Sequence, residues 1–265
     1  NQELTQDYII ERLAKRYAMS GKRDELEMLT WLFETAPDDD SRSLLLKGFE
    51  ESFEGRSLAS LPEGLLKGIR QAGGGSPILR VRLGQPEAIT KALTDIANTN
   101  VDVDARAGLI TVLGQIKNQD AVPIMLDLIK KDPSEIVVQA SLLALQSFED
   151  DKIALAALDS YSRFSTSTQA FAQSLLVSRE SWLGILLDGI ETGMIKADSI
   201  RQESILKIVL YNNKALQAKA EKLFGKVSAA SAAELQGRID QLVSVIDEAS
   251  GNPYDGKNLY LKHCG

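Results

Sequence analysis

The two residues of this chain best suited to chemistry are neighbours, His263 and Cys264. Cys264 is the only cysteine and His263 the only histidine among the 265 residues. General-base and triad mechanisms usually rest on an imidazole, and a structural zinc site needs several cysteine or histidine ligands. The sequence therefore predicts no catalytic residues and no metal site within this chain, and a single cysteine can form no internal disulfide.

Three other groupings suggest chemistry, but each has a simpler structural interpretation. Glu50 and Glu54 are four residues apart on a predicted helix, as paired acids would be, but a solvated helix face is the favoured interpretation. The glycine-rich segment Gly73–Gly75 lacks the lysine of a P-loop, so we expect a connection between helices. Trp31 and Trp182 fall within apolar helical periodicity, which favours packing in the core.

The elements that must position any site are predicted to be helices, because helical periodicity runs along most of the chain and strand signals are nearly absent. A three-residue pattern also recurs at a spacing of 33: Gly108-Leu109-Ile110, Ser141-Leu142-Leu143 and Ser174-Leu175-Leu176. Two periodic segments per repeat describe a helical hairpin that must stack on a copy of itself to cover its apolar face.

We expect antiparallel helix pairs at 5–19 with 22–35, 41–54 with 61–72, 77–83 with 86–98, 103–117 with 120–131, 134–149 with 151–163, 167–178 with 181–192, and 198–211 with 213–226. A last helix is expected at 231–249, before Pro253 interrupts the pattern. Asp132, which precedes Pro133, is predicted to cap the helix at 134–149.

The segments 106–113 and 139–145 resemble the first helices of HEAT-like repeats, and this resemblance is specific between about residues 86 and 190. It implies an all-α fold, an α-solenoid (superhelix) of about six to seven stacked HEAT-like antiparallel helix pairs. The repeat domain would cover residues 1–249 and be less regular at 55–85.

The charge of the chain bears on its partners. A net charge of −7 disfavours nucleic acid and anionic lipid, and no apolar run approaches the roughly 20 residues that span a membrane. In such a solenoid the second helices are expected to line a concave face, whose mixed charges favour a protein partner. The candidate contact residues on this face are Asp127, Lys130, Lys131, Asp159, Arg163, Asp188 and Glu191.

The tail carries a second resemblance. Gly256, Leu259, Tyr260 and Cys264 have the spacing G-x-x-L-Y-x-x-x-C, which is similar to the opening of a class I c-type cytochrome domain. This implies that residues 250–265 are a linker and the truncated start of such a domain. Cys264 would be the first haem thioether cysteine if the natural chain continues as C-x-x-C-H, and His263 would have no assigned role. No cofactor is expected in this fragment, and haem c is expected in the full-length parent.

Helical repeats that run into a cytochrome start resemble part of the bacterial periplasmic membrane-bound dehydrogenase-type multidomain proteins. The resemblance implies a non-catalytic scaffold or protein-interaction module between a dehydrogenase-like domain and a c-type cytochrome electron-transfer domain in a larger exported, periplasmic protein. The N-terminus has no start methionine, which favours a processed or excised piece. One alternative is a free-standing cytoplasmic adaptor with HEAT-like repeats. Another is a haem- or bilin-modifying lyase, although no acid–base constellation supports that activity.

Overall fold

The computed structural model describes residues 9–53, 61–211, 213–225, 230–248 and 251–263. The chain divides into two compact units, Asn1–Leu186 and Leu187–Gly265. The described residues form helices and no strands. The prediction of an all-α solenoid is therefore confirmed.

The helices of the first unit are α2 (Ile10–Ser20), α3 (Arg23–Thr35), α4 (Asp39–Phe53), α5 (Glu63–Gln71), α6 (Pro77–Arg82), α7 (Pro86–Ala97), α8 (Val103–Gln115), α9 (Ala121–Lys131), α10 (Glu135–Leu145), α11 (Asp151–Ser160), the 3₁₀ turn η2 (Tyr161–Arg163) and α12 (Thr166–Leu176). Helix α13 (Glu180–Glu191) begins in the first unit and ends in the second. The second unit continues with η3 (Ala197–Ser199), α14 (Gln202–Leu210), α15 (Lys214–Phe224), α16 (Ala230–Glu248) and α17 (Pro253–His263).

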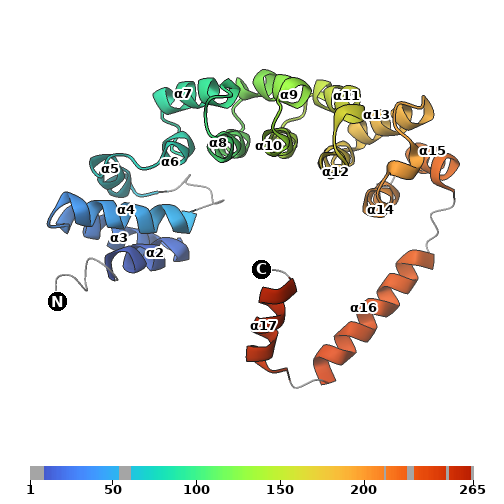
Figure 1. The fold of residues 1–265 in the computed structure, drawn as a ribbon. Coiled ribbons are helices and arrows are strands. Elements are labelled where there is room, and N and C mark those ends of the chain that lie inside the picture. Colours follow the sequence, from blue (N-terminus) through green and yellow to red (C-terminus); the bar gives the residue numbers. More distant parts are fainter. Residues whose placement is uncertain (1–8, 54–60, 212, 226–229, 249–250, 264–265) are drawn as a thin grey trace. The chain divides into compact units, whose positions relative to one another are not determined.

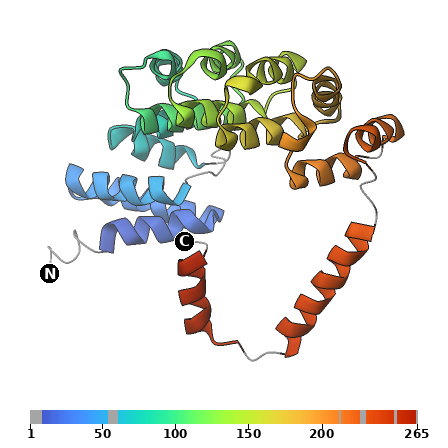
Figure 2. The same ribbon diagram turned by 45° about the vertical axis from the view of Figure 1, so that its right-hand side comes forward.

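Helices of the first unit form two layers (Figure 1 and Figure 2). The first helices of successive pairs, α8, α10 and α12, lie side by side in one layer, and α10 packs against both of its neighbours. The second helices, α7, α9 and α11, form the other layer. Each helix therefore contacts its own pair and the adjacent pairs, which is the arrangement of a helical-repeat array.

The 33-residue pattern marks the contact between these layers. Leu142 and Leu175 are fully buried, Leu109 is nearly so, and the Ser141 hydroxyl donates a hydrogen bond to the Val137 carbonyl 2.8 Å away. A buried leucine at the same position of each first helix fills the same space against the second layer. The repeat in the sequence is thus a repeat of core packing.

Two sequence expectations about buried residues need correction. Trp182 is fully buried as predicted, but Trp31 is 53% exposed. Asp132 does not cap α10, which begins after Ser134 without a side-chain cap. One oxygen of the Asp132 carboxylate accepts from the Ser134 backbone N–H at 2.9 Å, and the other pairs with the buried guanidinium of Arg106.

The amino-terminal helices pack through a glycine. A Cβ atom on Gly48 of α4 would lie 2.1 Å from the backbone carbonyl oxygen of Glu11 on α2. The Ser52 hydroxyl donates to the Lys15 carbonyl across the same contact, at 3.0 Å. Because glycine has no Cβ atom, Gly48 thus lets α2 and α4 approach closely.

We expect Gly48→Ala to lower the free energy of unfolding by about 1–3 kcal/mol, because the added methyl group must push two packed helices apart. Thermal unfolding followed by circular dichroism measures the loss. Gly237→Ala is the matched control, since a Cβ there meets nothing within 4 Å in α16. The control should be neutral or slightly stabilising, and an equal loss in both variants would show that the α2–α4 contact is not tight.

Candidate protein-interaction surface

The predicted contact residues lie on second helices, as the sequence indicated. Asp127, Lys130 and Lys131 are exposed on α9, and Asp159 and Arg163 are exposed on α11 and η2. Asp127 and Lys131 pair with each other, with 2.6 Å between Oδ1 and Nζ. These five side chains belong to the first unit.

The other two predicted residues, Asp188 and Glu191, belong to the second unit and contact α15. The Glu191 carboxylate accepts from Lys222 at 2.9 Å and from Lys219 at 3.1 Å, and these hydrogen bonds lower the pKa of Glu191. Asp188 also pairs with Lys219 and is the main cause of the raised pKa of that lysine. Both acids thus stabilise the packing of α13 on α15.

The opposite layer of the first unit presents a surface without charge. The stretches 107–116, 136–148 and 164–178, which contain most of α8, α10 and α12, include no Asp, Glu, Lys or Arg. Ile136 is 51% and Leu143 50% exposed on α10, two turns apart on one side of the helix. We call this surface the first-helix face and define it by its exposed or partly buried residues Gly108, Thr111, Ile136, Ala140, Leu143, Ala170, Phe171 and Ser174.

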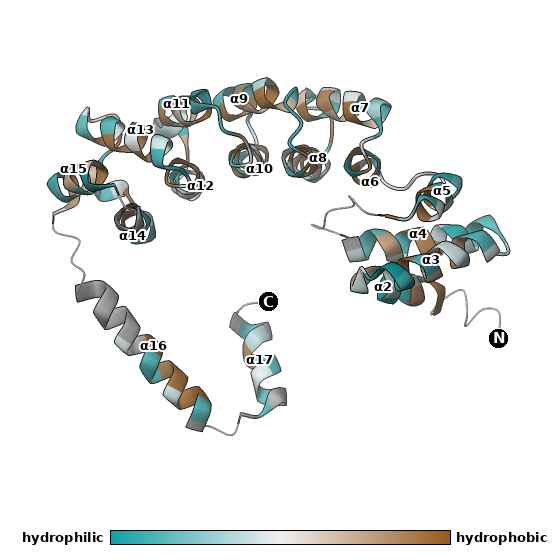
Figure 3. Ribbon diagram, turned by 180° about the vertical axis from the view of Figure 1, so that it is seen from behind, coloured by the Kyte–Doolittle hydropathy of each residue, from teal (hydrophilic) through white to brown (hydrophobic). Residues whose placement is uncertain are grey.

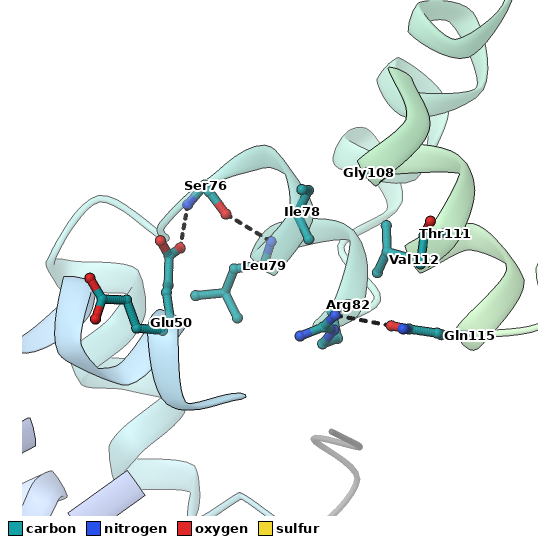
Figure 4. A pocket seen from close by; sticks show the side chains of 10 residues that line it. Glu50, Ser76, Ile78, Leu79, Arg82, Gly108, Thr111, Val112 and Gln115 are labelled. Carbon is teal, nitrogen blue, oxygen red and sulfur yellow. Dashed lines mark hydrogen bonds between the residues drawn. The ribbon is translucent and has the colours of Figure 1, made fainter. Parts of the chain in front are cut away.

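A groove of about 490 Å³ adjoins the first-helix face where α4, α6 and α8 meet (Figure 4). Its apolar lining comes from Ile78, Leu79 and Val112. Gly108 lets α6 pack closely against α8, since a Cβ atom at residue 108 would lie 2.9 Å from the Cδ1 atom of Ile78. The groove thus extends the apolar character of the face.

Polar contacts hold the two ends of this groove. The backbone N–H of Ser76 donates to the Glu50 carboxylate at 2.5 Å, and the Arg82 guanidinium donates to the side-chain oxygen of Gln115 at 3.0 Å (Figure 4). Glu51, also in the lining, pairs with Lys15 at 2.9 Å, and this interaction lowers the pKa of Glu51. The acids near residue 50 therefore serve as structural partners in α4, while Glu54 lies outside the described residues.

The glycine-rich segment connects α5 to α6, as expected. Gly73, Gly74 and Gly75 all have left-handed backbone angles, with φ between 76° and 93°. The Arg80 guanidinium donates to the carbonyl oxygens of Gly73 and Gly75, at 2.5 and 3.0 Å. The segment is thus a turn that an arginine ties to α6.

The tail residues are only partly described. Helix α17 ends at His263, while Cys264 lies outside the described residues. Leu259 and Tyr260 are 58% and 62% exposed. Among the residues that the structure describes, no group of three His, Cys, Asp or Glu side chains could hold a metal ion, and no helix has the length and apolar character to cross a membrane.

The fold and its surface define the class of the protein as a helical-repeat solenoid. Residues 90–175, from within α7 to α12, match the family described as HEAT repeats. Proteins with such repeats are generally non-enzymatic scaffolds that commonly mediate protein–protein interaction and typically need no cofactor. No curated protein and no solved structure matches the chain.

Proposed function

We propose that this chain is a non-catalytic scaffold that binds a protein partner through the first-helix face. The observation that carries the proposal is the exposure of Ile136 and Leu143 in a layer without charged side chains between residues 136 and 148. Depletion of charge with exposed large apolar groups is typical of the core of a protein interface. The second helices carry the charges of an ordinary solvated surface.

A comparative capture experiment tests this surface. The double variant I136E/L143E places two carboxylates on the face, and L155E is the matched control, because Leu155 is 49% exposed on α11 in the opposite layer. A partner captured by the wild type and L155E should be bound at least about tenfold more weakly by the double variant, since interface anchors contribute 2 kcal/mol or more.

The captured protein is identified by mass spectrometry, and its Kd is then measured for each variant. Circular dichroism checks that all variants keep their helical content. Loss of binding in L155E or K130E/K131E, with normal binding by I136E/L143E, would place the interface on the second helices and contradict the proposal.

We further propose that the scaffold links a dehydrogenase-like domain to a c-type cytochrome domain in a larger exported protein. The support is the spacing of Gly256, Leu259, Tyr260 and Cys264, together with the placement of the first three on the single helix α17. In that protein Cys264 would form the first thioether bond to haem.

The coding sequence beyond Gly265 tests this link. We expect one unspecified residue, then cysteine and histidine, so that Cys264 and Gly265 begin a C-x-x-C-H motif. In the full-length protein, exported with a cytochrome maturation system, a haem stain should mark the wild type and weaken in Cys264→Ser. A stop codon after Gly265 would exclude the link and favour the free-standing adaptor.

A further inference from the structure

Helix α16 of the second unit exposes a group of large apolar side chains. Figure 3 shows hydrophobic residues along the later turns of this helix. They are exposed by 49–73%, and we call them the α16 stripe: Ile239, Leu242, Val243, Val245 and Ile246. Five such residues within eight positions form a contiguous patch, and such patches mark interaction sites.

Helix α16 is not covered within its own unit. The side chains of the stripe are 49–73% exposed, so no described helix of the second unit packs over them. Its 19 residues include Gly237 and four β-branched side chains in the stripe, all with lower helix propensity than alanine. Most helices in proteins are stabilised by packing of their apolar face, so a partner along the stripe would supply what α16 lacks.

The spacing of the stripe identifies the kind of partner. Ile239, Leu242 and Ile246 are three and four residues apart, which places isoleucine at the a positions and leucine at the d position of a heptad. Among parallel coiled coils, isoleucine at a with leucine at d favours two strands over three or four. In such a pair Ile239, Leu242 and Ile246 each meet their own copy, and Val243 and Val245 flank this seam at e and g, so the surface is complementary to itself.

The charges of α16 permit this pairing. Asp240 and Asp247 occupy b positions, which point away from the partner helix in a coiled coil, and no residue of the stripe is charged. Two copies can therefore approach in register without like charges in contact. The acids also oppose binding to an anionic membrane, which attracts helices with lysine and arginine on their polar face.

We propose that α16 pairs with α16 of a second copy of this chain, in a parallel two-stranded coiled coil along the α16 stripe. The pairing is separate from partner binding on the first-helix face. Loss of one interaction would therefore leave the other measurable.

Sedimentation equilibrium of the full chain tests the proposal, in a Cys264→Ser background that excludes a disulfide-linked dimer. We expect a concentration-dependent dimer, weakened at least about tenfold by L242E, which buries a carboxylate at the d position. S244E is the matched control, because Ser244 is exposed on α16 outside the stripe. It should dimerise like the wild type.

Cysteine cross-linking tests the register in the same background. Ile246→Cys should form a disulfide-linked dimer under mild oxidation, because a positions of a parallel pair face each other, whereas Ser244→Cys should not. A wild-type monomer at all concentrations, a dimer unaffected by L242E, or equal cross-linking at both positions would overturn the proposal. A monomer would assign the stripe to another partner.

Discussion

Replacement of Arg106 by alanine is expected to lower the free energy of unfolding by about 3–5 kcal/mol, because it leaves a buried carboxylate without its counter-charge. Arg106 is 1% exposed in α8. Its guanidinium donates to the Ile96 carbonyl at 2.8 and 3.0 Å and pairs with Asp132, whose side chain is 2% exposed. One side chain thus joins the end of α7, the start of α8 and the connection after α9. Urea unfolding followed by circular dichroism measures the effect.

Two variants separate the loss of this ion pair from a general effect of removing charge. Lys131→Ala breaks the exposed pair with Asp127, and its cost should stay below about 1 kcal/mol because exposed pairs contribute little. The double variant R106M/D132L should recover most of the stability lost in R106A, since no buried charge is then left unpaired. If R106A lowers the free energy of unfolding no more than Lys131→Ala does, the buried pair does not hold these helices together.

The helices themselves could be predicted from the sequence, because the signals that define them are local. The expected helix at 120–131 is observed as Ala121–Lys131, and the one at 86–98 as Pro86–Ala97, with Pro86 in the first helical position. Apolar spacing and proline both act within a few residues of the chain. Because these helical signals recur along the chain in pairs, they also indicate the all-α repeat fold.

The role of Asp132 could not be predicted in the same way. An aspartate before Pro133 has the features of a helix cap, and that interpretation needs only neighbouring residues. Its partner Arg106 is 26 residues earlier, on another helix. The hydrogen bond from the Ser134 N–H to Asp132 is local, but the pairing with Arg106 depends on how the hairpins stack, and a local pattern contains no information on that.

The surface proposed here differs from the one that the charged residues of the sequence indicate. Those residues lie on the second helices, whereas the signal for the first-helix face is an absence of charge between 136 and 148. That absence could have been read from the sequence. The exposure of Ile136 and Leu143 could not, since an uncharged helix is equally compatible with complete burial.

The two tryptophans differ in their helical phase relative to the buried residues of their helices. On α3 the buried residues are Leu26, Leu29 and Phe33, and Trp31 lies two positions from Leu29, on the other side of the helix. On α13 Trp182 is in phase with the buried Leu186. Periodicity predicted a helix at both places, but only the phase distinguishes the core position from the exposed one.

Trp182→Ala is expected to lower the free energy of unfolding by about 3–5 kcal/mol, as for large core residues whose removal leaves a cavity. The ring is fully buried, its Nε1–H donates to the Asp151 carboxylate at 3.0 Å, and the Arg179 guanidinium lies 5.0 Å from its centroid. The side chain therefore fixes the start of α13 against α11. Trp182→Phe keeps most of the packing and should cost about 1–2 kcal/mol, since it mainly removes the hydrogen bond.

Trp31→Ala is the matched control at an exposed position of α3. It should lower the free energy of unfolding by no more than about 1 kcal/mol, because Trp31 is 53% exposed. The chain has two tryptophans, so each alanine variant leaves one fluorescent reporter. Trp31→Ala should retain the emission of a buried indole until the chain unfolds in urea, whereas Trp182→Ala should retain a solvent-exposed emission from the start. Equal destabilisation by the two variants would show that burial at Trp182 contributes no more than the exposed contact at Trp31, and the assignment of α13 to the core of the solenoid would then be wrong.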